Sequence, residues 1–121
     1  MNLKKIVITG AEGFIATNLI FKLSNFKEFD LVGLDSSIAK SSNRDFTQDK
    51  INHNKLDIST SLDLLDLIEG ADIVVHLAAR GNVIESILNP IENFNSNSYS
   101  TLVLLEAMRK GNVKNLVFSS T

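Results

Sequence analysis

Thr9-Gly10-Ala11-Glu12-Gly13-Phe14-Ile15-Ala16 is the stretch that decides the fold of this 121-residue chain. The β-branched run Ile6-Val7-Ile8 precedes it and a helically spaced apolar segment follows it, so it joins a strand to a helix. Gly10 permits a tight turn, and Gly13 lets the backbone approach a pyrophosphate. Ala16 is small enough for close packing of the helix on a sheet. With the free N–H groups of the helix N-terminus, the stretch predicts a dinucleotide site.

An ordinary strand-to-helix turn also uses glycine, so a lone glycine pattern has low specificity. Here the pattern lies between an expected strand and an expected helix over 14–23, which favours the nucleotide interpretation. A triphosphate loop of the Gly-x-x-x-x-Gly-Lys type is excluded, because Ile15 occupies the place of the second glycine.

Short β-rich runs alternate with helical stretches along the rest of the chain. Further strands are expected over 31–34, 51–56, 73–77 and 116–118, and the polar segment 36–50 is expected to be a surface loop. Strands that are apolar throughout and separated by helices predict a parallel sheet covered on both faces. We therefore expect an α/β doubly wound Rossmann fold with strand order 3-2-1-4-5.

Three helices are expected, each with one apolar face. A helix that starts near Thr60, as N-cap, ends at Gly70, and a long helix runs from Pro90 to Gly111 with a Glu106–Lys110 pair. The predicted apolar faces are Phe14, Ile15, Leu19, Ile20 and Leu23 on the first helix, Leu62, Leu65 and Ile68 on the second, and Leu102, Leu105 and Met108 on the third.

Composition and charge exclude several classes of protein. The net charge of −2 has no run of one sign behind it, which gives no support for a nucleic-acid or membrane-surface partner. No cysteine is present, so disulfides and thiolate metal sites are excluded, and a cytoplasmic location is expected. The apolar run 6–8 is too short for a signal peptide or membrane span. His53 and His76 lack nearby carboxylate spacing, so no metal site is expected.

Asp35 ends the second expected strand, where a carboxylate accepts both ribose hydroxyls of an adenosine. The same charge repels a 2′-phosphate, which favours NAD over NADP, although a solvated loop aspartate remains the alternative. Asp57 ends the third strand in the same way and, taken alone, is equally a loop or capping residue. His76 is expected to be a strand-end residue with a satisfied ring, whereas chemistry alone leaves Asn97 ambiguous.

A series of motifs covers essentially the whole chain. In order they are Thr9-Gly10-x-x-Gly13-Phe14-Ile15, Asp35, Leu56-Asp57-Ile58, His76-Leu77-Ala78-Ala79, Asn97-x-x-x-Thr101 with 104–107, and 113–115 leading to 118–121. Together they resemble the extended short-chain dehydrogenase/reductase family, specifically its NAD-dependent nucleotide-sugar epimerases and dehydratases.

The resemblance implies roles for individual residues. Phe14 and Ile15 place backbone N–H groups at the pyrophosphate of NAD, and Ser36 adjoins the ribose aspartate. The further implied cofactor contacts are Asp57 and Ile58 at the adenine, Leu77, Ala78 and Ala79 at the middle of the cofactor, and Asn97 beside it. Thr121 matches the catalytic Ser/Thr that hydrogen-bonds the substrate hydroxyl and assists the tyrosine base of a Tyr-x-x-x-Lys motif.

That motif is absent from these residues, because the only tyrosine is Tyr99 and Val103 stands where the lysine belongs. In the resembled family the motif and a sugar-binding region follow the Ser/Thr strand. Residues 1–121 are therefore expected to be the N-terminal part of an NAD-binding domain, catalytically inactive alone and without the nucleotide-sugar region. The alternatives are a non-catalytic NAD-binding sensor or scaffold, and an NADP-dependent atypical reductase. The apolar strand 116–118, as an unpaired edge, is also expected to promote self-association.

Overall fold

The computed structural model describes residues 2–37 and 51–120, and it contains one five-stranded parallel sheet. Thr121 and most of the loop expected over 36–50 lie outside the described residues. The order β3-β2-β1-β4-β5 confirms the predicted fold class and strand order. The strands are β1 (Lys4–Thr9), β2 (Phe29–Asp35), β3 (Asn52–Lys55), β4 (Ile73–His76) and β5 (Leu116–Phe118).

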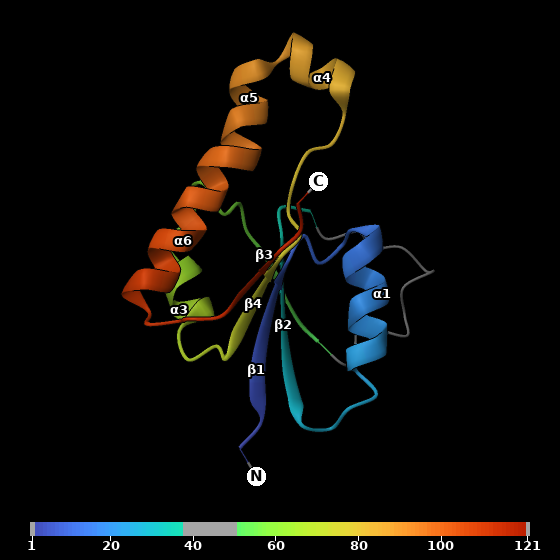
Figure 1. Cartoon of the computed structure of the whole chain (residues 1–121), viewed down its shortest axis with the longest axis vertical. Coiled ribbons are helices and arrows are strands. Elements are labelled where there is room, and N and C mark those ends of the chain that lie inside the picture. Colours follow the sequence, from blue (N-terminus) through green and yellow to red (C-terminus); the bar gives the residue numbers. More distant parts are fainter. Residues whose placement is uncertain (1, 38–50, 121) are drawn as a thin grey trace.

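Helices cover both faces of the sheet, with α1 on one side and α3 and α6 on the other (Figure 1). Helices α4 and α5 extend beyond the carboxyl ends of the strands. The helices are α1 (Phe14–Leu23), α3 (Leu64–Ile68), α4 (Val83–Leu88), α5 (Pro90–Phe94), the π-helical segment η1 (Asn95–Tyr99) and α6 (Ser100–Lys110).

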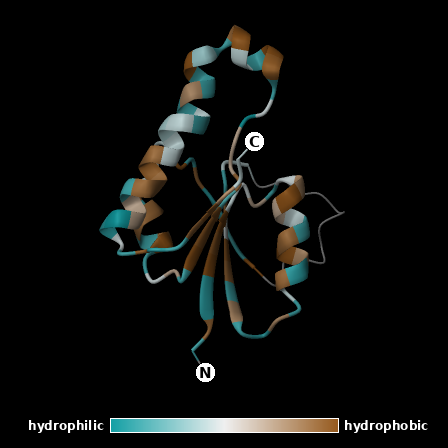
Figure 2. Cartoon of the chain, in the orientation of Figure 1, coloured by the Kyte–Doolittle hydropathy of each residue, from teal (hydrophilic) through white to brown (hydrophobic). Residues whose placement is uncertain are grey.

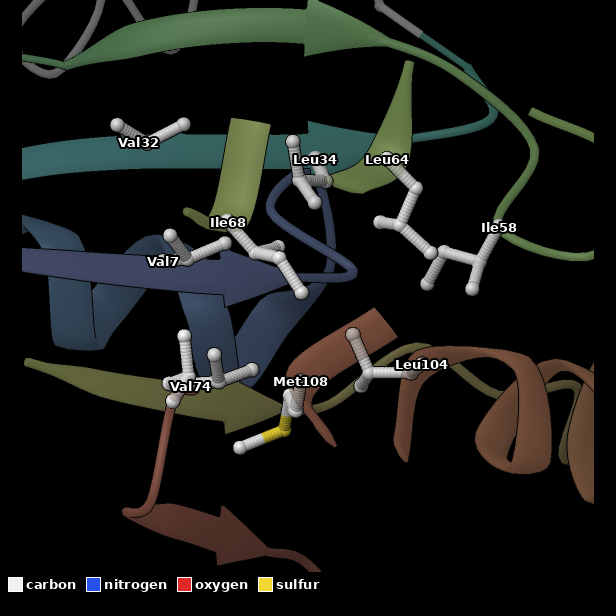
Figure 3. Packing of buried hydrophobic residues seen from close by; sticks show 10 residues of the cluster. Val7, Val32, Leu34, Ile58, Leu64, Ile68, Val74, Leu104 and Met108 are labelled. Carbon is white, nitrogen blue, oxygen red and sulfur yellow. The ribbon is translucent and has the colours of Figure 1, made fainter. Parts of the chain in front are cut away.

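Two apolar clusters form the core, one on each face of the sheet. Val7 of β1 packs with Leu104 and Met108 of α6 on one face (Figure 3). Ile6 and Ile8 lie in the opposite cluster, against α1. Because neighbouring side chains of a strand point to opposite faces, the burial of both faces requires apolar residues without interruption.

The predicted apolar face of α1 is wrong at its start. Ala16 and Ile20 are buried, whereas Phe14 is 86% exposed and Ile15 is also exposed. Ala16 and Ile20 stand one helical turn apart and share a face. Phe14 lies two residues before Ala16, about 200° around the helix, and therefore points away from the sheet.

Helix α3 starts later than the sequence predicts. Its N-cap is Asp63 and not Thr60, which lies in a preceding turn where its backbone N–H donates to the carbonyl of Asp57 at 3.2 Å. The helix begins after Asp63 with the buried Leu64. Leu62, predicted to lie on the apolar face, is 96% exposed since it precedes the helix.

The predicted face of the long helix is also largely wrong. On α6 the buried residues are Ser100, Leu104 and Met108, spaced four apart. Leu102 is 63% exposed and Leu105 is exposed as well. The buried face of α6 begins at Ser100, which is polar. A pattern of apolar residues alone therefore selects the adjacent face with Leu102 and Leu105.

The region expected to be one helix from Pro90 to Gly111 comprises α5, η1 and α6, with Pro90 at its start and Gly111 as its C-cap. Helix α4 was not predicted. Its N-cap Asn82 accepts a hydrogen bond from the backbone of Glu85 at 3.0 Å, and this Asn-x-x-Glu spacing is the signal for it in the sequence. Among the described residues no helix is long and apolar enough to cross a membrane.

Candidate nucleotide-binding site

A hollow of about 250 Å³ opens at the carboxyl ends of the strands. It lies where the strand order reverses between β1 and β4, which is where open parallel sheets bind their ligands. The expected cofactor residues that line it are Gly10, Gly13, Asp35, Ser36, Asp57, Ile58, Leu77, Ala78 and Ala79. Five further residues that were not predicted also line it: Leu34, Leu56, Arg80, Ser96 and Ser100. Leu34 and Leu56 each precede one of the strand-end aspartates, which is the sequence signal for them.

The glycine loop forms one wall of the hollow. Gly10 has a φ of +65°, a conformation that side chains disfavour. A Cβ on Gly10 would lie 2.8 Å from the backbone nitrogen of Ala78, so the loop after β1 touches the segment after β4. Gly13 donates its N–H to the carbonyl of Gly10 at 2.9 Å, which closes the turn.

Phe14 and Ile15 do not line the hollow with their side chains, which are exposed. Their expected role uses the backbone instead. The first hydrogen bond of α1 runs from Thr17 N to the carbonyl of Gly13 at 2.9 Å, so the N–H groups of Phe14 and Ile15 have no partner within the helix. These groups and the positive end of the helix dipole are available to an anion beside the glycine loop.

Asp35 connects the end of β2 to the glycine loop. Its Oδ2 accepts the backbone N–H of Glu12 at 2.9 Å, and its Oδ1 accepts the backbone N–H of Ser37 at 2.9 Å. Oδ1 also accepts the Ser37 hydroxyl at 3.3 Å, so of the about four acceptor sites of a carboxylate one, on Oδ2, remains for a further donor. The carboxylate is thus fixed in orientation, and the Ser37 hydroxyl, its most distant donor, is the one that a ligand hydroxyl can replace.

Asp57 makes a local turn of its own. Its Oδ1 accepts from the backbone N–H of Ser59 at 2.9 Å and from the Ser59 hydroxyl at 2.6 Å. The loop role left open by the sequence is therefore observed, and Asp57 also lines the hollow, where its contact with a cofactor stays a prediction. The neighbouring Ile58 packs into the core cluster beneath it.

Asn97 shapes the wall of the hollow without lining it. It lies in the π-helical segment η1, and its Oδ1 accepts the backbone N–H of Arg80 at 2.7 Å. Its Nδ2 donates to the carbonyl of the same residue at 3.0 Å. The side chain of Asn97 thus clamps the end of the wall segment 77–80.

The guanidinium of Arg80 binds two carboxylates at the rim. Nη1 lies 2.8 Å from Glu85 of α4 and 2.8 Å from Glu92 of α5. These pairs are substantially exposed, so they stabilise the fold little. Glu85 lies on α4 and Glu92 on α5, so the two pairs connect these helices to Arg80 at the end of the wall.

His76 is 2% exposed and has both ring nitrogens hydrogen-bonded, as the sequence predicted for a strand-end histidine. The partner of Nε2 on α6 is Thr101. Burial lowers the pKa of the His76 imidazole below its usual value. In the part of the chain that the structure describes, no group of three or more His, Asp or Glu residues is placed to hold a metal ion.

Tyr99 does not face the hollow. It lines a separate apolar groove of about 420 Å³ between the start of α3 and the outer face of α6, together with Leu102 and Val103. The sole tyrosine of the sequence is therefore on a different surface from the glycine loop.

Residues 6–121 match the model of a protein family described as the NAD dependent epimerase/dehydratase family. The chain belongs to this family. The resemblance inferred from the motifs is thereby confirmed, and NAD dependence is a property of the family as a whole.

Individual relatives agree with this assignment. The chain is 32% identical to UDP-glucose 4-epimerase of Yersinia pestis, over 96% of this chain and 36% of that protein. It is 35% identical to a trifunctional UDP-glucose 4,6-dehydratase, 3,5-epimerase and reductase of Arabidopsis thaliana, over 98% of this chain and 19% of that protein. The structure of UDP-glucose 4-epimerase from Bifidobacterium longum with NAD+ and UDP superimposes with a TM-score of 0.84 at 33% identity, covering 98% of this chain and 37% of that one. The chain thus spans well under half the length of these relatives.

Proposed function

We propose that this chain is the NAD-binding part of a nucleotide-sugar epimerase or dehydratase. One observation carries the proposal: Gly10 and Gly13 of the glycine loop and the carboxylate of Asp35 line a single hollow at the switch point of the sheet. That NAD is bound in solved epimerase relatives supports the choice of ligand.

The pyrophosphate of NAD is expected to lie over Gly13, where the backbone has no side chain. The N–H groups of Phe14 and Ile15 then donate to its oxygens, aided by the helix dipole. Leu77, Ala78 and Ala79 line the opposite wall. When bound, NAD supplies the hydride acceptor, and these residues orient it and exclude water from it.

The adenosine end is expected to lie across the ends of β2 and β3. Asp35, with Ser36 beside it, accepts the ribose hydroxyls, while Asp57 and Ile58 border the adenine. A 2′-phosphate would be placed against the Asp35 carboxylate, which opposes NADP and therefore the reductase alternative.

Titration calorimetry of the 121-residue chain with NAD and NADP tests this function. We expect NAD to bind and NADP to bind more weakly. Equal affinity for the two dinucleotides would remove the proposed role of Asp35, and no binding of either to the folded chain would refute the function.

We also propose that the whole protein acts on a nucleotide sugar and that these 121 residues alone do not. The family relatives include both UDP-sugar epimerases and a dehydratase. Tyr99 lies in a groove away from the hollow with Val103 four residues later, so the described residues supply no tyrosine–lysine pair to move the proton. Loss of a general acid–base group typically slows a reaction about 10²- to 10⁴-fold. Turnover of a UDP-sugar by the purified chain at enzymatic rates would contradict this.

Self-association through β5 is a further proposal. Among the described strands, β5 pairs with β4 alone, and its Val117 and Phe118 are 50% and 53% exposed. An unpaired apolar edge promotes pairing with another chain. Light scattering should show a mass above one chain, which Val117→Lys should lower. A strictly monomeric chain at high concentration would contradict the proposal.

A further inference from the structure

Three polar side chains lie behind the wall of the hollow, and none of them is needed to contact the ligand. Thr9 and His76 are paired in register at the ends of β1 and β4, and both are almost fully buried. They point to the same face of the sheet as Val7 and Val74, toward α6, because side chains two apart in a strand share a face. Thr101 of α6 meets the His76 ring from above this face.

The hydroxyl of Thr9 has three neighbours, and their chemistry fixes the position of its hydrogen. The backbone N–H groups of Leu77 and Ala78 donate to Oγ1 at 3.0 and 3.1 Å. These two donors occupy both lone pairs of the hydroxyl. Its single hydrogen is therefore donated to Nδ1 of His76, which lies 2.6 Å away.

His76 is in consequence neutral, with its proton on Nε2. Nε2 lies 2.9 Å from the hydroxyl oxygen of Thr101 and donates to it. The Thr101 hydroxyl in turn donates to the backbone carbonyl of Asn97 at 2.7 Å. A proton on Nδ1 would face the Thr9 hydroxyl, whose lone pairs are already occupied, so the network accepts the imidazole only in its neutral form. On its other side the ring stacks on Phe118, with centroids 5.7 Å apart.

Together, these hydrogen bonds form a closed cycle around the wall segment 77–80. Thr9 holds the start of the segment through the amides of Leu77 and Ala78. Asn97 holds its end through both backbone groups of Arg80. His76 and Thr101 connect the two holding residues to each other.

We propose that His76 is a positioning residue that couples these two clamps, so that the wall of the hollow facing the glycine loop moves as one unit with η1 and α6. The inference deepens the proposed function and rests on it, since the wall matters to NAD only if NAD binds here. Gly10 and Ala78 approach closely on opposite sides of the hollow, so a shift of this wall changes the width of the hollow. The coupling is therefore expected to affect ligand binding. The π-helical turn that carries Asn97 is a geometry common at functional sites, and here it presents the clamp.

Amide hydrogen exchange of the 15N-labelled chain tests the coupling without any ligand. Thr101→Val removes the hydroxyl with little change of shape, whereas Thr101→Ser keeps the hydroxyl and serves as the matched control. In Thr101→Val we expect the amides of Leu77, Ala78 and Arg80 to exchange about tenfold faster, the effect of losing one net hydrogen bond. The amides over 31–34 provide the internal reference and should be unchanged.

A second variant interrupts the same hydrogen bonds at another residue, so the test does not depend on whether one variant folds. His76→Asn keeps an acceptor for the Thr9 hydroxyl but is too short to place a donor at Thr101, so it should loosen the Arg80 amide in the same way. In the unaltered chain, 15N shifts of the imidazole should show the proton of His76 on Nε2. Wild-type exchange at Leu77 and Ala78 in Thr101→Val, or a proton on Nδ1, would overturn the proposal.

The same variants, titrated with NAD, separate this proposal from the proposed function. Thr101→Val should bind NAD about tenfold more weakly than the unaltered chain, and Thr101→Ser should bind it nearly as well. If the unaltered chain binds NAD and Thr101→Val binds it equally, the positioning role is wrong and the function stands. If the folded, unaltered chain binds no NAD, the proposed function is wrong, and the exchange data decide the coupling on their own.

Discussion

The backbone N–H of Glu12 donates to Oδ2 of Asp35 at 2.9 Å, which ties the glycine loop after β1 to the end of β2. The carboxylate proposed to bind the ribose thus also holds the loop proposed to bind the pyrophosphate. Any substitution of Asp35 therefore acts on two parts of the site, and the two roles need different variants to separate them.

Asp35→Asn should separate charge from bracing. The amide oxygen can still accept from Glu12, although the NH2 group in place of Oδ1 loses the hydrogen bond from the Ser37 backbone. The repulsion of a 2′-phosphate is lost, so the preference for NAD over NADP should shrink. Asp35→Ala should in addition weaken NAD binding, by about 1–3 kcal/mol for hydrogen bonds to a charged group. Calorimetry with both dinucleotides measures this. An unchanged preference in Asp35→Asn would show that the charge does not select the cofactor.

Three glycine-to-alanine variants should destabilise the fold in a fixed order. Gly10 has φ +65° and backbone atoms within 3 Å of a new Cβ, whereas Gly70 has φ +74° with open space around it. Gly81 has open space and no positive φ. Gly70→Ala should cost about 1–2 kcal/mol for its backbone conformation, Gly10→Ala clearly more, and Gly81→Ala within about 0.5 kcal/mol of zero. Urea unfolding gives the three free energies of unfolding. If Gly10→Ala is no more destabilising than Gly70→Ala, the glycine loop does not contact the segment after β4.

Gly13→Val should abolish detectable NAD binding. A Cβ at this position already lies 3.1 Å from the carbonyl of Gly10, and the branched side chain would extend over the place proposed for the pyrophosphate. Far-ultraviolet circular dichroism controls for folding. Unchanged NAD affinity in a folded variant would show that the glycine loop is only a turn.

The contribution of His76 to the stability of the fold should decrease in mild acid. Burial lowers the pKa of the folded imidazole below its ordinary value of 6.5, so the unfolded chain binds the proton first. The stabilisation is complete above about pH 6.5, the value for an unfolded histidine, and is lost as the pH falls through the lower folded pKa. The difference in free energy of unfolding between the unaltered chain and His76→Asn should therefore shrink as the pH falls below 6.5. A difference independent of pH would contradict this.

Leu104 and Leu102 on α6 provide a matched pair for the core. Leu104 is fully buried, whereas Leu102 is 63% exposed. Leu104→Ala should cost about 2–5 kcal/mol, and Leu102→Ala about 0.5 kcal/mol or less. Similar costs for the two would mean that α6 presents a different face to the sheet.

The sequence predicts what is local or periodic. The strand 116–118 and the helix 14–23 agree with the structure to the residue, and the strand order follows from their alternation with helices. Helix faces were predicted less well, because the rotation of a helix depends on the surface it packs against. Leu62 and Leu102 are apolar residues that the fold leaves exposed. Figure 2 shows apolar segments, in brown, on the helices that extend beyond the strand ends as well as on the sheet.

The candidate site divides in the same way. Strand-end residues such as Gly10 and Asp35 could be predicted, since parallel strands bring their carboxyl ends together. The closed set of hydrogen bonds around the wall segment 77–80 could not be predicted. Thr9 and His76 are separated by 67 residues, and Asn97 and Arg80 by 17, so no spacing pattern in the sequence connects them.

The central claim is that NAD binds in the hollow between the glycine loop and the segment after β4. The most direct measurement is a titration of the 15N-labelled chain with NAD, followed amide by amide. The account predicts the largest shifts at Gly13, Phe14, Ile15, Ala78 and Ala79, with smaller ones at Tyr99 and Leu102 in the separate groove. Shifts centred on the groove, or none in a folded chain at millimolar NAD, would contradict it.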